Sequence, residues 1–322
     1  MLKIKNKNLK IPAIAVIFFS LLLTITSFYS GLSYSQSRNN GSQSSSVGAD
    51  DFAIEKSKTP ELKFFVMSFC PYGNQMEDIL RPVFDLIGNN ANIQPQYIFD
   101  KIDDLDAYCK TRAGDVNQCA AYVDSKYFST LAECQETVNS NFAKCTDESA
   151  YIKASTGVYY ASLHGRVEAN QNIREICAWN QVKDKKQWWD FIANVNKACD
   201  SQNADTCWQE QADKAGLDSN KITECFNQEA IDLIEKEVAL TEKYEISGSP
   251  TLLLNGVKFP PESAYKQDGT GILKVGKKSF SQDKFRTPDF IKEAVCAGFN
   301  KAPADCKKEI SEPATAAAAG GC

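Results

Sequence analysis

The sequence has very little of what metal and nucleic-acid sites are made of. Only one of its 322 residues is a histidine, and no two of its twelve cysteines are separated by just two residues, so the ligand spacing of a zinc site is missing. The net charge is −5 at pH 7, and no basic stripe runs along the chain. We therefore expect no metal, no organic cofactor and no nucleic-acid partner.

The chain opens with the pattern of an export signal. Four lysines, at positions 3, 5, 7 and 10, precede an apolar run from Ile11 to about Ile25 that continues weakly through Leu32. Small residues at Ser33-Tyr34-Ser35 suit a cleavage site, whereas the apolar run is also about the 20 residues that span a bilayer. We expect residues 1–33 to be a signal peptide or a membrane anchor, with a slight preference for the anchor. In either case the rest of the chain lies outside the cytosol.

Composition divides the remainder of the chain. Residues 34–58 are rich in Ser, Asn, Gln and Gly and predict a flexible linker. Residues 59–306 predict the folded domain, with a Cys-rich insertion at 101–150 and a helical insertion at 168–244. Residues 307–322 predict a disordered tail. We favour a purely structural role for the Cys-rich insertion, and substrate docking is the alternative.

Twelve cysteines in an exported chain indicate disulfides. The symmetric spacing in the Cys-rich insertion permits a nested pair of bridges. A helical hairpin farther along would bring Cys207 and Cys225 together. Cys296 and Cys306 are a local pair, and Cys177–Cys199 is assigned by elimination only. The expected bridges are Cys109–Cys145, Cys119–Cys134, Cys207–Cys225, Cys177–Cys199 and Cys296–Cys306. They leave Cys70 and Cys322 over.

Apolar periodicity predicts an α/β domain. A strand over 62–69, a helix over 73–87 and a strand over 93–99 form a β-α-β unit, and Asn255-Gly256 predicts a hairpin between two later strands. The other expected elements are helices at 168–179, 185–198, 204–214, 219–244 (broken near Asn227) and 287–297, strands at 251–254 and 257–259, and a loop at 260–286.

Cys70 stands where the first strand meets the first helix. Unsatisfied backbone N–H groups and the positive end of a helix dipole both favour a thiolate there, and the thiolate is the nucleophile of disulfide exchange. We expect Cys70 to be catalytic, with Pro71, Tyr72 and Gly73 shaping the active-site loop. The alternative is a buried structural thiol.

Ser249-Pro250 leads the apolar strand at 251–254 and predicts a cis peptide whose loop binds a substrate strand. With Cys70 it suggests a thioredoxin-type site that has one cysteine fewer than usual, because Gly73 stands at the second cysteine position. The site is then either monothiol, or its resolving thiol comes from elsewhere, with Cys322 as the candidate. Cys322 is sixteen residues after Cys306 and can reach up to about 55 Å. Pairing between molecules, or no role, are the alternatives for Cys322.

One segment carries a family signature. Residues 162–177, Ser-Leu-His-Gly-Arg-Val-Glu-Ala-Asn-Gln-Asn-Ile-Arg-Glu-Ile-Cys, resemble the signature of the gamma-interferon-inducible lysosomal thiol reductase family, Cys-Gln-His-Gly-x2-Glu-Cys-x2-Asn-x2-Glu-x-Cys. The positions that match are His164, Gly165, Glu168, Asn172, Glu175 and Cys177. Two family cysteines are replaced, by Ser162 and Ala169.

This resemblance implies a thioredoxin-like fold with a large helical insertion, broadly similar to DsbA-like proteins, and thiol–disulfide exchange as the activity. We expect His164 to be structural, because the signature lies away from the expected active-site loop; acid–base work is the alternative.

The sequence thus predicts an extracytoplasmic protein that exchanges disulfides with protein substrates through Cys70. Its partners would be protein thiols or disulfides, a redox partner that the sequence does not identify, and a membrane through residues 1–33. The alternative is a redox-inert thioredoxin-fold module that binds extended or unfolded chains.

Overall fold

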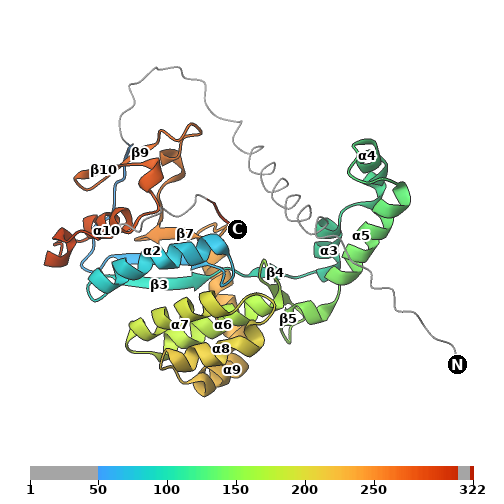
Figure 1. Cartoon of the computed structure of the whole chain (residues 1–322), viewed down its shortest axis with the longest axis horizontal. Helices are drawn as coiled ribbons and strands as arrows, with labels where there is room; N and C mark the ends of the chain where they lie inside the picture. Colours follow the sequence, from blue (N-terminus) through green and yellow to red (C-terminus); the bar gives the residue numbers. More distant parts are fainter. Residues whose placement is uncertain (1–49, 311–319) are drawn as a thin grey trace. The chain divides into compact units, whose positions relative to one another are not determined.

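The structure is a computed structural model that describes residues 50–310 and 320–322 (Figure 1). The expected signal peptide or anchor at 1–33 lies outside the described residues, as do residues 34–49 of the expected linker and 311–319 of the expected tail. In the described part of the chain, none of the helices has the length and apolar character needed to cross a membrane.

A four-stranded sheet forms the centre of the fold, in the order β3-β2-β7-β8. Strands β2 (Glu61–Val66) and β3 (Asn92–Tyr97) are parallel and are joined by helix α2 (Pro71–Ile87). Strand β7 (Thr251–Leu254) runs antiparallel to β2 and forms a hairpin with β8 (Val257–Phe259). Helix α10 (Pro288–Ala297) follows and packs beside α2. This β-α-β and β-β-α arrangement is the one expected of a thioredoxin-like fold.

The hairpin turn depends on its two residues. Asn255 has φ 48° and Gly256 has φ 81°, the pair of positive values that a type I′ turn requires. Because this turn matches the strand twist, it fixes the register in which Leu254 lies opposite Val257.

The helical insertion shares one core with the sheet. It consists of α6 (Arg166–Gln181), α7 (Lys185–Ala198), α8 (Ala204–Lys214) and α9 (Ser219–Lys243), which lie together in yellow tones in Figure 1. Trp189 of α7 stacks on Phe64 of β2 at 5.6 Å between ring centroids, and Trp188 meets the same ring edge-on. Helix α9 runs through Asn227 without the expected break.

The Cys-rich insertion has almost no core of its own. It contains α3 (Leu105–Ala113), α4 (Cys119–Asp124) and α5 (Leu131–Cys145), bridged by Cys109–Cys145 and Cys119–Cys134 as the spacing predicts. Around α4 and α5 the buried apolar residues are Cys119, Cys134 and Val138, so the bridges replace the packing that a segment this small lacks.

Two of the expected disulfides are wrong. The structure pairs Cys177 with Cys225 and Cys199 with Cys207, in place of Cys177–Cys199 and Cys207–Cys225. The expectation assumed that α8 and α9 face each other along their length. Instead α9 packs chiefly along α6, which brings Cys225 to Cys177, and α8 folds back onto the end of α7. The local pair Cys296–Cys306 is present as expected.

The segment 260–286, expected as a loop, contains a second small sheet. Strands β9 (Ile272–Val275) and β10 (Lys278–Ser281) form a hairpin, and β1 (Asp50–Asp51) pairs with β9. Leu273 and Val275 alternate with exposed residues, a pattern too short to stand out among lysines and glycines. The remaining elements are β4 (Asp100–Ile102), β5 (Ile152–Lys153), β6 (Tyr159–Ala161) and the short 3-10 helices η1 (Val116–Gln118), η2 (Glu148–Ala150), η3 (Glu262–Ala264), η4 (Gln282–Lys284) and η5 (Ala304–Lys307).

The two corrected bridges should differ in their contribution to stability. They close 48 and 8 residues of sequence, so the chain-entropy relation gives about 4 kcal/mol for Cys177–Cys225 and about 2.5 kcal/mol for Cys199–Cys207. We expect Cys177→Ala/Cys225→Ala to lose more free energy of unfolding in urea than Cys199→Ala/Cys207→Ala, and neither variant to expose a free thiol. Two titratable thiols in the first variant would contradict the observed pairing.

Candidate active site

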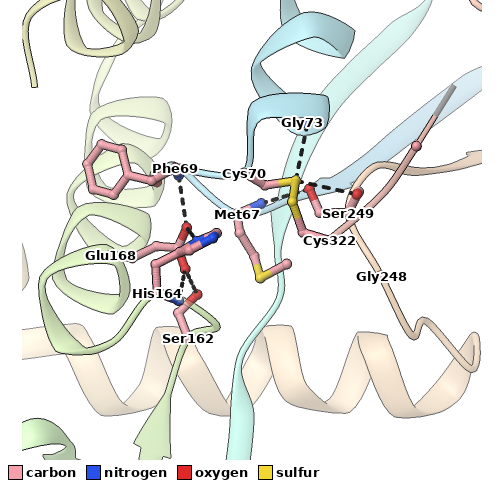
Figure 2. Close-up of a disulfide and its surroundings, with 12 residues drawn as sticks. Met67, Phe69, Cys70, Gly73, Ser162, His164, Glu168, Gly248, Ser249 and Cys322 are labelled. Carbon is pink, nitrogen blue, oxygen red and sulfur yellow. Dashed lines mark hydrogen bonds and ion pairs between the residues drawn. A yellow bond between two sulfur atoms is a disulfide. The ribbon is translucent and has the colours of Figure 1, made fainter. Parts of the chain in front are cut away.

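Cys70 is the N-cap residue of α2, directly before Pro71 at the first helical position. Its backbone N–H donates to Met67 O at 3.0 Å, which closes the turn that follows β2. The Gly73 N–H donates to Cys70 Sγ at 3.4 Å (Figure 2). The sulfur therefore lies among the free N–H groups of the helix start, where negative charge is stabilised.

The Ser249-Pro250 peptide is cis, as the sequence predicts, and its loop faces Cys70. Cys70 Sγ lies 3.5 Å from Ser249 O, and the Met67 N–H donates to Ser249 Oγ at 3.2 Å (Figure 2). Ser249 is fully buried, so the cis-Pro loop and the Cys70 turn are fixed against each other. A second cis peptide, Phe259–Pro260, ends β8 and was not expected from the sequence.

Cys322 is bonded to Cys70. The disulfide joins residues 252 positions apart in the sequence, with 6.0 Å between their Cα atoms. The Cys322 N–H donates to Ser249 O at 2.8 Å and the Ser249 N–H donates to Cys322 O at 3.1 Å. Two residues that exchange both bonds form the hydrogen-bonded pair of an antiparallel sheet. The described end of the tail, residues 320–322, is thus an ordered strand-like segment on the cis-Pro loop, where the sequence predicts disorder.

Position 73 has no room for the second cysteine of a dithiol motif. A Cβ added to Gly73 would lie 2.7 Å from Ser249 Oγ and 3.5 Å from Cys70 Cβ. Since the Ser249 hydroxyl is held by the Met67 N–H, a larger residue at 73 would break that contact. The absence of a side chain at Gly73 therefore leaves space for the Ser249 hydroxyl.

The signature residues hold the turn before Cys70, which corrects the expectation that they lie away from it. Glu168 Oε1 accepts the Phe69 N–H at 2.9 Å, and Asn172 Oδ1 accepts both the N–H and the hydroxyl of Ser68 at 2.9 and 2.7 Å. Both side chains are fully buried on α6. Ser68 and Phe69, the two residues before Cys70, are thus bonded to the helical insertion.

Glu168 is in turn held from the start of α6. Ser162 Oγ donates to Glu168 Oε2 at 2.7 Å, the His164 N–H donates to the same oxygen at 2.9 Å, and His164 Nδ1 lies 2.8 Å from Glu168 Oε1 (Figure 2). Gly165, with φ 92°, allows the chain to turn into the helix. Ser162, which replaces a family cysteine, therefore keeps a place in this network.

The hydrogen bond between His164 and Glu168 shifts the pKa of both side chains. The hydrogen bond to Glu168 raises the pKa of His164 above its ordinary value. Burial pushes the pKa of Glu168 upward, but the bonds from His164 and Ser162 outweigh burial and hold it below its ordinary value. Farther along α6, burial raises the pKa of Glu175 to about 7, and its Oε2 accepts the hydroxyl of Tyr97 at 2.7 Å.

The remaining signature residue, Cys177, lies away from the Cys70 turn. Cys177 lies in the Cys177–Cys225 bridge and stabilises the packing of α6 on α9. Within residues 50–310 and 320–322, no group of His, Cys, Asp and Glu side chains is arranged to hold a metal ion.

The family model of the vacuolar sorting receptor thioredoxin-like domain matches residues 110–260, just under half of the chain. This range includes the signature and the cis-Pro loop and leaves out Cys70. No curated protein is similar enough to the chain to count as a relative.

Three solved structures are similar over most of their length. They are a candidate protein disulfide isomerase from Nitrosomonas europaea (10% identity, 69% of this chain and 88% of that one, TM-score 0.34), the reduced disulfide bond oxidoreductase DsbG from Mycobacterium tuberculosis (12%, 78% and 88%, 0.38) and the oxidoreductase NmDsbA1 from N. meningitidis (14%, 65% and 77%, 0.26). At these TM-scores the function has to be argued from the chain's own residues.

His164 offers a direct test of the network, because it is the only histidine of the chain. We expect its ring protons to titrate in NMR above the ordinary pKa of 6.5, and Glu168→Gln to lower that pKa. Since the folded-state pKa of His164 is raised, its bond to ionised Glu168 stabilises the fold below the unfolded-state pKa of histidine, and this contribution is lost as the pH rises through the folded-state pKa of His164. It is also lost in acid, as the pH falls through the lowered folded-state pKa of Glu168. Glu262→Gln on η3 serves as the control. A pKa unchanged by Glu168→Gln would contradict the pairing.

Proposed function

We propose that this chain carries out extracytoplasmic thiol–disulfide exchange on protein substrates, with Cys70 as the nucleophile. The observation that carries the proposal is the position of Cys70 Sγ, between the Gly73 N–H and the backbone of Ser249 before a cis proline. The thiolate is stabilised by the start of α2, and a substrate strand beside it can bond to the cis-Pro loop.

Ser249 supplies the substrate contact in this proposal. Its N–H and C=O both bond to Cys322, which shows that they point outward toward a chain bonded to Cys70. An extended substrate in a mixed disulfide with Cys70 would bond to the same two groups. Only main-chain atoms take part, so these bonds themselves do not depend on the substrate's side chains.

Cys322 is the resolving thiol that position 73 lacks. The Cys70 thiolate attacks one sulfur of a substrate disulfide, and the other substrate sulfur leaves as a thiolate. The Cys322 thiolate then attacks Cys70 Sγ, which releases the second substrate thiolate and leaves the Cys70–Cys322 disulfide. Two electrons pass to the substrate, and a dithiol redox partner restores both thiols. Run backward, the same steps oxidise a substrate dithiol.

All twelve cysteines lie in six disulfides, which indicates an oxidising compartment. We assign export to residues 1–33, as a signal peptide or as an anchor that keeps the domain at a membrane. The resemblance of residues 162–177 to the gamma-interferon-inducible lysosomal thiol reductases supports the same class of chemistry.

A redox-inert binding module is the second candidate, and one observation favours it. Cys70 is fully buried in its disulfide, so in this state it cannot attack a substrate. The two candidates differ in the properties of Cys70 once Cys322 is removed.

The variant Cys322→Ser decides between them, because Cys70 is then a free thiol. We expect its pKa, measured from the pH dependence of alkylation, to lie below the ordinary value of about 8.5, because the helix start stabilises the thiolate. Cys70→Ser/Cys322→Ser supplies the background rate. A Cys70 pKa at or above about 8.5, together with slow alkylation, would contradict the exchange activity and support the redox-inert binding module.

The role of Cys322 has its own test. With a disulfide-bonded protein as substrate, Cys322→Ser should accumulate as a mixed disulfide with that protein, because nothing releases the bound half. The parental chain should release it, and Cys70→Ser should form no mixed disulfide. Release by Cys322→Ser at the parental rate would remove the tail thiol from the mechanism. The species are counted by mass spectrometry after acid quenching.

A further inference from the structure

The end of the tail occupies a surface made by Tyr72, Gly248, Ser249 and Arg286, which we call the tail-binding surface. Cys322 exchanges two backbone bonds with Ser249, and Arg286 donates a hydrogen bond to Gly320 O. Residues 320–322 are therefore bound at both ends through their own main-chain atoms, by the backbone of Ser249 and the side chain of Arg286. This segment shows one path that a chain bonded to Cys70 can take across this surface.

A side chain on either of the two residues before the bonded cysteine would crowd this surface, and the clash is severe at Gly320. A Cβ on Gly320 would lie 2.1 Å from a ring carbon of Tyr72, far inside contact distance. A Cβ on Gly321 would lie 3.2 Å from Ser249 O, closer than ordinary packing. On the protein side, a Cβ on Gly248 would lie 2.8 Å from Cys322 O. Glycine thus occurs on both sides of the contact.

We infer that the tail-binding surface selects extended chains that carry Gly-Gly directly before the reacting cysteine, and that Gly320-Gly321-Cys322 is the chain's own ligand of this kind. The inference rests on the proposed function, since it names the substrates of the same site. Main-chain bonds to Ser249 supply affinity, and contact with Tyr72 and Ser249 rejects larger residues. A substrate must displace the tail, whose short tether gives it an effective concentration on the order of millimolar.

The test uses the full chain with Cys322→Ser and two five-residue peptides, Ala-Ala-Gly-Gly-Cys and Ala-Ala-Val-Val-Cys, each bearing thionitrobenzoate on its cysteine. The Cys70 thiolate attacks the peptide sulfur, a Cys70–peptide disulfide forms, and thionitrobenzoate leaves as a coloured thiolate. We expect the Gly-Gly peptide to react roughly tenfold faster, the order that small steric differences in a binding site produce. The bare reagent dithiobis(nitrobenzoate) measures the reactivity of Cys70 without a peptide.

Tyr72→Ala separates selection by the surface from differences between the peptides. It removes the ring that Gly320 contacts, so the preference for Gly over Ala at the second position before the cysteine, measured with Ala-Ala-Ala-Gly-Cys, should disappear. Tyr127→Ala, which removes an exposed tyrosine of the Cys-rich insertion, should keep it. Equal rates for the two original peptides, with a reactive Cys70, would overturn the inference and leave the proposed function standing. A Cys70 that is inert even to the bare reagent would overturn the proposed function.

Discussion

The turn from Met67 to Cys70, at the start of α2, is the point at which distant parts of the fold are bonded together. Four different parts of the chain bond to it: the cis-Pro loop through Ser249, helix α6 through Glu168 and Asn172, the first turn of α2 through Gly73, and the tail through its disulfide. Backbone N–H groups of a buried turn must be satisfied, and here carboxylate, amide and hydroxyl oxygens from distant segments accept them. The bonds that stabilise this part of the fold are therefore the same bonds that position Cys70.

This arrangement makes the helical insertion part of the surroundings of Cys70. A carboxylate buried on α6 is costly unless it is bonded on every side, and Glu168 meets that need with Ser162, His164 and Phe69. The same bonds fix the direction in which the turn presents Cys70. Of the six signature residues, Glu168 and Asn172 on α6 bond directly to this turn, and His164, just before the helix, bonds to Glu168.

The sequence was sufficient where the signal is local. The β-α-β unit, the Asn255-Gly256 hairpin and the cis peptide before Pro250 follow from neighbouring residues. The nested bridges of the Cys-rich insertion and the Cys296–Cys306 bridge follow from cysteine spacing. It failed where packing between helices decides, as for Cys177, whose partner depends on α9 crossing α6 rather than on spacing. The contact of Glu168 with Phe69 was missed for the same reason, because 99 residues separate them.

The contact between position 73 and Ser249 bears both on the absence of a cysteine at position 73 and on the position of Cys322 in the tail. At position 73 a side chain would displace the Ser249 hydroxyl, and with it the bond that fixes the cis-Pro loop to Met67. A dithiol within the motif would thus cost the loop its fixed position. Placing the partner thiol on a tether removes that conflict, and it changes the chemistry as well. In the disulfide with Cys70, Cys322 occupies both backbone groups of Ser249. Under the proposed function, a bound substrate strand has to leave these groups before Cys322 can bond to them.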